Sequence, residues 1–182
     1  MEVIKTKIEG VYIISPKLYG DDRGYFFESF NKRNLEQYLP KNIEFVQDNQ
    51  SKSKKGVLRG LHFQSPPYDQ GKLIRVLSGK VLDVVVDIRR NSKTYGEHVS
   101  IELNSADHQM VWVPPGMGHG FLTLEDDTIF SYKCTNYYYP ESEGAILWRD
   151  EDLGINWEIE DAPLVSEKDK LGIRFKDFIS PF

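Results

Sequence analysis

Two neighbouring segments with β-strand character carry an unusual number of polar side chains. The first spans residues 47–51 (QDNQS), and the second spans residues 56–64 (GVLRGLHFQ), which include Arg59 and His62. Inward positions of a small β-barrel are normally apolar, so such a set indicates a cavity that holds a polar ligand. The competing interpretation is two edge strands with solvated faces, and the pattern alone does not separate the two.

Two further stretches hold side chains that could do chemistry. Residues 112–121 (WVPPGMGHGF) predict a rigid turn that delivers His119 at the start of a strand, flanked by glycines that let a ligand approach. Tyr132 and Tyr138 share one face if their strand continues, because side chains alternate. A histidine beside a turn is more often structural, and strand tyrosines usually pack with the hydroxyl at the rim.

The rest of the chain predicts a scaffold of strands to position these residues. β-branched and aromatic runs alternate with clusters of Gly, Pro, Asn, Asp and Ser, a rhythm typical of an all-β sandwich or barrel. Strands are expected over residues 11–15, 25–29, 44–51, 57–64, 72–77, 80–88, 98–103, 110–113, 120–124, 129–135 and 145–148.

Local signals add one hairpin and two short helices. Ser78-Gly79 predicts a two-residue turn that pairs the strands on either side of it. A helix is expected over residues 31–39, where Asn31 can cap, and a helical turn over residues 167–170, where Ser166 can cap. The predicted apolar face of the first helix holds Leu35, Tyr38 and Leu39.

Length and composition favour one globular unit. The 182 residues are 40% hydrophobic and 28% charged, which predicts a single domain over residues 1–182. We expect the acidic segment from about residue 149 to residue 182 to wrap the barrel.

Charge and cysteine content exclude several classes of partner. A net charge of -5 favours neither nucleic acid nor an anionic membrane, and no apolar run approaches the roughly 20 residues that span a bilayer. One cysteine, Cys134, cannot form an internal disulfide, and no leader pattern opens the chain. These features predict a cytoplasmic protein.

Together the motifs resemble the dTDP-4-dehydrorhamnose 3,5-epimerases of the cupin superfamily, from about residue 20 to residue 175. The resemblance implies a cupin-like jelly-roll β-barrel with a few short helices. The matching parts occur in the expected order: 22–24 (DRG) with Phe26 and Glu28, the Gln47, Asn49 and Ser51 ladder, 56–62 (GVLRGLH), 71–72 (GK), 115–116 (PG), 119–121 (HGF), the tyrosine segment and 166–169 (SEKD).

The reaction that the resemblance implies uses no cofactor and no metal. The substrate is dTDP-4-dehydro-6-deoxy-D-glucose, whose C4 ketone acidifies the C–H bonds at C3 and C5. Double epimerisation then needs a base on one face of the sugar, an acid on the other, and stabilisation of the enolate oxygen.

The resemblance assigns the acid and base groups. His62 would be the base, since a neutral imidazole accepts a proton near neutral pH. Asp169 would orient His62 and stabilise the imidazolium, and Tyr132 would be the acid on the opposite face. The pairing of His62 with Asp169 requires the C-terminal segment to fold back onto the barrel.

Three more residues are implied at the enolate oxygen. Lys72, with His119 nearby, would stabilise the developing negative charge. Asp83 would orient or balance the Lys72 ammonium.

The nucleotide end of the substrate is assigned by the same resemblance. Arg59 and Arg23 would bind the diphosphate, because guanidinium groups match phosphate oxygens in pairs. Gln47, Asn49 and Glu28 would hydrogen-bond the nucleotide, and Phe26, Tyr138 or Phe121 would pack against thymine or sugar. Family members are homodimers with exchanged N-terminal strands, so the residues of that region can serve the pocket of the partner subunit.

One geometric difficulty follows from these assignments. Arg59 and His62 are three positions apart, so a regular strand would point them to opposite faces. A bulge or strong twist at Gly60 would resolve this, because glycine is a usual bulge residue.

Three alternative functions remain open. A metal-dependent cupin is disfavoured, because His62 is followed by Phe63 and Gln64 rather than by a second nearby histidine, and His98 and His108 lie in polar segments expected to be exposed. An epimerase acting at C3 only or at C5 only would keep the same motifs. A non-catalytic sugar-nucleotide-binding module would not need the acid and base groups.

Overall fold

The computed structural model describes residues 1–159 and 161–182 of the chain. Strands dominate, as expected, and helices are limited to short segments. The strands are β1 (Glu2–Lys5), β2 (Tyr12–Ser15), β3 (Tyr19–Asp21), β4 (Gly24–Phe26), β5 (Gln47–Ser53), β6 (Val57–Gln64), β7 (Lys72–Ser78), β8 (Lys80–Asp87), β9 (His98–Asn104), β10 (Met110–Val113), β11 (Met117–Thr123), β12 (Thr128–Cys134), β13 (Glu143–Ala145) and β14 (Leu164–Val165). The helices are α1 (Lys32–Leu35) and α2 (Glu167–Lys170), with 3₁₀ turns at Pro140–Ser142 and Phe175–Asp177.

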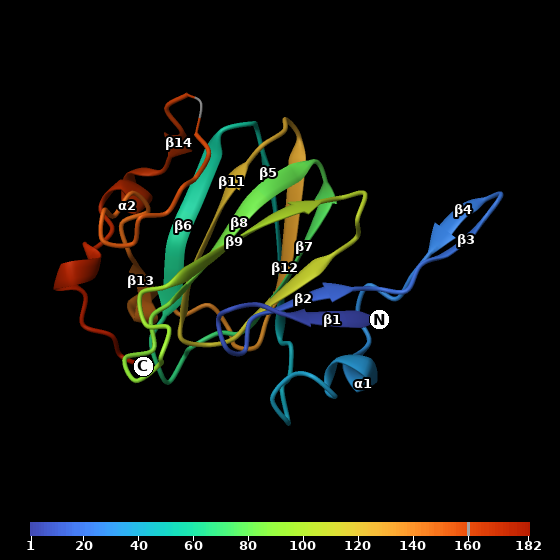
Figure 1. The fold of residues 1–182 in the computed structure, drawn as a ribbon, viewed down its shortest axis with the longest axis horizontal. Helices are drawn as coiled ribbons and strands as arrows, with labels where there is room; N and C mark the ends of the chain where they lie inside the picture. Colours follow the sequence, from blue (N-terminus) through green and yellow to red (C-terminus); the bar gives the residue numbers. More distant parts are fainter. Residues whose placement is uncertain (160) are drawn as a thin grey trace.

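Two sheets face each other and form the body of the jelly roll (Figure 1). One sheet has the order β1-β2-β10-β7-β12-β5, and the other has the order β13-β6-β11-β8-β9 with β14 beside β6. The hairpin β3–β4 pairs only with itself and projects away from this body (Figure 1). The all-β jelly-roll expectation is therefore confirmed.

The space between the sheets is filled by alternating inward side chains. In β8, Val81 and Val85 point into this core, while Leu82 and Val84 point to the other face, because successive side chains alternate. The same alternation puts Asp83 among the inward residues. The core contains Ile8, Val11, Ile74, Val76, Val81, Val85, Ile101, Leu103, Val111, Val113, Met117, Phe121 and Phe130.

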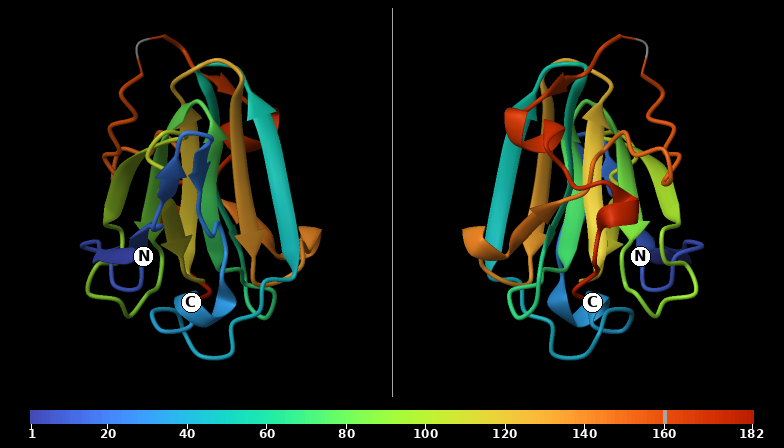
Figure 2. Two further views of the ribbon diagram at one scale, coloured as in Figure 1. Left: turned by 90° about the vertical axis from the view of Figure 1, so that its right-hand side faces the viewer. Right: turned by 90° about the vertical axis from the view of Figure 1, so that its left-hand side faces the viewer.

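The C-terminal segment covers the outer face of the sheet that contains β6. Leu153, Trp157 and Phe178 pack against outward residues such as Leu58 and Leu82. Figure 2 shows this segment, in orange and red, lying across the sandwich. This segment places α2 next to β6, so that Asp169 of α2 comes within hydrogen-bonding distance of His62 of β6.

Several local expectations can be compared directly with the structure. The hairpin is confirmed, since β7 ends at Ser78 and β8 begins at Lys80. The first helix is shorter than predicted, and Asn31 caps it by accepting a hydrogen bond from the amide of Asn34. Tyr38 is 43% exposed, so its place on the apolar face was wrong. The strand β1 was not predicted, because its alternation is too short to stand out.

A β-bulge lies at Gly60, where the sequence predicted one. Arg59 pairs with Phe121, and His62 pairs with His119, so β6 has one residue more than β11 over this interval. Gly60 has φ of 130°, and a Cβ there would lie 2.4 Å from the Cα of Gly120. Only glycine fits this close approach, and the predicted bulge is confirmed.

No helix in the described parts of the chain is long and apolar enough to cross a membrane.

Candidate active site

His62 and Asp169 form a direct pair between β6 and α2. The Nε2 atom of His62 lies 2.5 Å from Oδ1 of Asp169, whose side chain is only 4% exposed. The second oxygen of Asp169 accepts a 3.4 Å hydrogen bond from the amide of Gly60. Ser166 caps α2 by accepting a hydrogen bond from the amide of Asp169, so the capping signal in the sequence also places the carboxylate.

Electrostatics keep this carboxylate charged. Burial opposes its ionisation, but the hydrogen bond and charge of His62 outweigh burial and lower the pKa of Asp169 below its ordinary value. A carboxylate can only accept hydrogen bonds, so Nε2 of His62 must carry the proton. The lone pair of neutral His62 is therefore on Nδ1.

Tyr132 lines the same cavity as His62. The cavity measures about 270 Å³ and is bounded by Gln47, Asn49, His62, Phe63, Gln64, Gln70, Lys72, Tyr132, Tyr138 and Glu143. Burial raises the pKa of Tyr132, and the nearby charge of Arg59 opposes this only in part. The phenol is therefore protonated at neutral pH and can donate a proton.

Lys72 brings a half-buried amino group to this cavity. Its Nζ atom lies 5.9 Å from the centre of the Tyr132 ring. Burial lowers the pKa of Lys72, while Cys134, Asp83 and Glu143 favour the charged form and oppose that effect. A cation with little water around it interacts strongly with a developing oxyanion.

His119 and Asp83 form a second buried pair behind the cavity. The Nε2 atom of His119 lies 2.8 Å from Oδ2 of Asp83, and the two side chains are 7% and 0% exposed. Burial lowers the pKa of His119 more than Asp83 raises it. We expected Asp83 to orient or balance Lys72. It acts on Lys72 through its charge, while its hydrogen bond goes to His119, and its Oδ1 atom has no partner among the described residues.

Two of the predicted nucleotide-binding amides lie where they were expected. Gln47 donates a 3.0 Å hydrogen bond to Asn49, and both line the cavity. Gln47 also accepts a hydrogen bond from the amide of Tyr138. Arg59 precedes the bulge on β6, is exposed, and donates to Ser53 at 3.4 Å; it is not one of the residues that bound the cavity.

Phe121, which we expected to pack against the ligand, does not line this cavity. Phe121 is 5% exposed, belongs to the core between the sheets, and stacks on Phe130 with ring centres 4.0 Å apart. The alternation of β11 explains this position, because residues that point between the sheets can line either the cavity or the packed core.

The three predicted residues of the N-terminal region lie away from the cavity of their own chain. Arg23 and Phe26 belong to the hairpin β3–β4, which projects from the body (Figure 1). Phe26 is 67% exposed. Arg23 pairs with Asp21 inside the hairpin. Glu28 accepts hydrogen bonds from two asparagines of the α1 segment rather than reaching the cavity.

Sequence reasoning missed two charged residues at the cavity rim. These residues are Glu143 and Lys168. Glu143 accepts a 2.7 Å hydrogen bond from the Tyr138 hydroxyl and forms an ion pair with Lys168. Burial opposes ionisation of Glu143, but its bonds from Lys168 and Tyr138 lower its pKa overall. The position of Glu143 depends on β13 pairing with β6, and that of Lys168 on the folding of α2 against β6; neither contact has a signal in the local sequence pattern.

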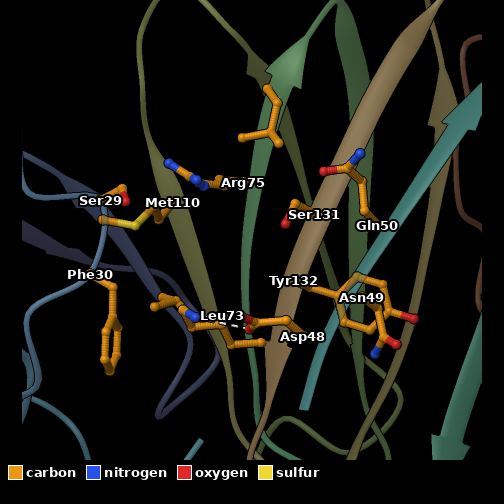
Figure 3. A pocket seen from close by; sticks show the side chains of 12 residues that line it. Ser29, Phe30, Asp48, Asn49, Gln50, Leu73, Arg75, Met110, Ser131 and Tyr132 are labelled. Carbon is orange, nitrogen blue, oxygen red and sulfur yellow. Dashed lines mark hydrogen bonds and ion pairs between the residues drawn. The ribbon is translucent and has the colours of Figure 1, made fainter.

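A second hollow lies on the outer face of the other sheet, away from the histidine. It measures about 330 Å³ and presents Asp48, Arg75, Ser131 and Met110 (Figure 3). Asn49 and Tyr132 line this hollow too, but neither of the two histidine–aspartate pairs does. The described residues also include no cluster of three or more metal-ligating side chains. His98 and His108 are half-buried rather than exposed, and the His108 ring packs at a tilt against Tyr25 with ring centres 4.5 Å apart.

The chain is similar to known proteins in both sequence and structure. A family model described as dTDP-4-dehydrorhamnose 3,5-epimerase matches residues 5–177. The relative of that name from Salmonella typhimurium is 52% identical over 169 residues, covering 93% of this chain and 92% of the relative.

Two solved structures show the range of the similarity. A dTDP-6-deoxy-D-glucose-3,5-epimerase from Legionella pneumophila, in complex with dTDP-4-keto-L-rhamnose, has a TM-score of 0.92 at 46% identity and covers 96% of this chain and 93% of that one. A 3'-monoepimerase from Streptomyces bikiniensis, in complex with dTDP-quinovose, has a TM-score of 0.90 at 32% identity and covers 94% and 87% of the two chains. The backbone fold is thus similar to epimerases of both kinds.

Proposed function

The chain belongs to the dTDP-4-dehydrorhamnose 3,5-epimerase family, and from this premise we propose how its cavity performs the reaction. The protein is an isomerase that inverts C3 and C5 of dTDP-4-dehydro-6-deoxy-D-glucose and yields dTDP-4-dehydro-L-rhamnose for dTDP-L-rhamnose synthesis. One observation supports the mechanism most strongly: His62, held by Asp169, and Tyr132 line one cavity together with Lys72.

His62 removes the proton from each carbon next to the ketone. Its Nδ1 atom carries the lone pair, because Nε2 donates to the charged Asp169. As His62 becomes positively charged, Asp169 stabilises the imidazolium and holds the ring in place.

Lys72 stabilises the enolate that this step creates. The negative charge moves onto the C4 oxygen, and the half-buried Lys72 ammonium donates to that oxygen with less competition from water than at the surface. His119 and Asp83 support Lys72 from behind, since Asp83 adds negative charge near the ammonium without occupying the cavity.

Tyr132 completes each inversion from the opposite face of the sugar. Its raised pKa keeps the phenol protonated until the enolate carbon accepts the proton. His62 then releases its proton to solvent and Tyr132 regains one from solvent, so that abstraction and return at the second carbon give the double inversion.

The nucleotide end of the substrate binds at the rim. Arg59 pairs with the diphosphate, Gln47 and Asn49 hydrogen-bond the nucleotide, and Tyr138 packs against thymine. The chain acts in the cytoplasm as a homodimer with exchanged N-terminal strands. The projecting hairpin β3–β4 supports this arrangement, because it would carry Arg23 and Phe26, with Glu28 just after it, to the pocket of the partner subunit.

Incubation with dTDP-4-dehydro-6-deoxy-D-glucose in heavy water tests the function. Mass spectrometry should find two exchanged carbon-bound positions on the sugar. One exchanged position would identify an epimerase of a single carbon, and none would identify a binding module.

A further inference from the structure

The side chain of Gln64 is buried at the end of the strand that carries His62. It is 5% exposed, and all three of its hydrogen bonds go to main-chain atoms. Nε2 donates to the carbonyl of Tyr68 at 2.5 Å and to the carbonyl of Tyr137 at 3.1 Å. Oε1 accepts from the amide of Tyr139 at 2.8 Å. Both donor hydrogens of the amide are therefore used within the protein.

Two of these bonds hold the peptide groups on either side of Tyr138. The carbonyl of Tyr137 belongs to the peptide before Tyr138, and the amide of Tyr139 belongs to the peptide after it. Restraining both peptides restrains φ and ψ of the residue between them. The amide of Tyr138 itself donates to Gln47 at 2.9 Å, so its main chain is held at three points.

The third bond ties this tyrosine segment to the loop after β6. Tyr68 of that loop stacks on Tyr139 with ring centres 3.9 Å apart. Gln70 donates to the carbonyl of Asn136 at 2.8 Å, and Asn136 donates back to Pro67 at 3.4 Å. The two loops therefore form one rim, with Gln64 bonded to both.

The consequence falls on the Tyr138 ring. That ring lines the cavity with His62 and Tyr132 and remains 52% exposed, while its hydroxyl donates to Glu143. A half-exposed ring has few packing contacts of its own, so its direction depends on its main chain and on this hydroxyl bond.

We propose that Gln64 is a positioning residue that presets the Tyr138 ring for the nucleotide base and thereby controls substrate affinity rather than proton transfer. This inference rests on the proposed function. If the ring is already held in its bound orientation, less conformational entropy is lost when the nucleotide binds. The proton-transfer groups are held independently, His62 by Asp169 and Tyr132 by its place in β12.

Gln64→Met tests the proposal, since methionine fills similar volume without hydrogen bonds. Calorimetric titration with dTDP should give a Kd raised roughly tenfold. KM for the ketosugar nucleotide should rise with it, while kcat stays within about threefold of the unmodified protein. Gln109→Met is the matched control, because Gln109 donates to Ser15 far from the rim, and it should leave both constants unchanged.

A double-mutant cycle with Tyr138→Ala shows whether Gln64 acts through that ring. If it does, Gln64→Met should weaken dTDP binding far less in the Tyr138→Ala protein than in the unmodified one. An equal loss in both backgrounds, or an unchanged Kd in the single variant, would overturn the proposal. A fall in kcat with unchanged Kd would also overturn it.

A second variant covers the case in which Gln64→Met does not fold. Gln64→Glu keeps an acceptor for the Tyr139 amide but cannot donate to the two carbonyls, and it should also raise the Kd for dTDP. Failure of the proposed function is a separate result, because the unmodified protein would then exchange no sugar protons, whether or not it binds dTDP.

Discussion

Asp169 lies against His62 with their oxygen and nitrogen 2.5 Å apart, although 107 positions separate the two residues in the chain. Two features of the sequence create this contact. Ser166 caps the short helix α2, and the apolar C-terminal residues hold the segment against β6. The strength of the base thus depends on a segment that lies outside the two main sheets.

Asp169→Asn should lower kcat by about 10²- to 10⁴-fold with little change in KM. Asparagine can still accept the hydrogen bond from His62, but it no longer stabilises the imidazolium with a full charge. Steady-state kinetics on the ketosugar nucleotide measure the effect, with Asp177→Asn on the exposed 3₁₀ turn as control. A kcat within about threefold of normal would show that the charge is not needed.

Tyr132→Phe should separate proton exchange from inversion. The enolate can form without the phenol, so deuterium should still enter from solvent, while formation of the inverted sugar falls by about 10²-fold or more. NMR of the product mixture reports both quantities. Tyr12→Phe, which removes a hydroxyl in the cluster on the outer face, is the control. Equal losses of exchange and inversion would assign another role to Tyr132.

Mixing two inactive variants tests the exchanged dimer. If Arg23 acts in the partner's pocket, His62→Ala and Arg23→Ala chains refolded together should recover about a quarter of normal activity. Half of the dimers would then be mixed, and each mixed dimer would contain one intact site. Recovery at background level would place Arg23 in the site of its own chain or outside the site.

Asp87 should make the fold sensitive to acid. Burial alone would raise its pKa, but hydrogen bonds from Arg89, Ser92 and Thr94 bring the pKa to about 2, below the ordinary value of 3.8. Because the folded-state pKa is the lower one, this stabilisation is present above about pH 4 and is lost as pH falls towards 2. The difference corresponds to about 2 kcal/mol.

Urea unfolding at pH 6 and at pH 2 measures this contribution. Asp87→Asn should lose stability at pH 6 and show a smaller further loss on acidification than the unmodified protein. Asp48→Asn, at an exposed carboxylate, provides the control. If the free energy of unfolding of Asp87→Asn fell with pH as much as that of the unmodified protein, Asp87 would not be the cause of the acid sensitivity.

The sequence predicted most of the scaffold because its strands have strong local signals. Alternation and turn residues located β6, β7 and β8 to within one residue, and the need for a bulge at Gly60 followed from the spacing of Arg59 and His62. The exposed hairpin β3–β4 was seen only as a single strand, since its packing partner is not determined by its own residues.

The site was less predictable than the scaffold. Alternation shows which face of a strand a side chain is on, but not whether that side chain reaches the cavity or the packed core. Phe121 and Tyr132 both point between the sheets, yet only Tyr132 reaches the cavity. Glu143 and Gln64 meet through the pairing of β13 with β6, which is a tertiary contact. Such contacts become visible only when strand order is known.

Solvent deuterium uptake by His62→Ala tests the central claim most directly. His62 is the base at both carbons, so the variant should incorporate no deuterium at C3 or at C5 of the ketosugar, while dTDP still binds. Uptake at both carbons at the normal rate would show that another group removes the protons and would contradict the account.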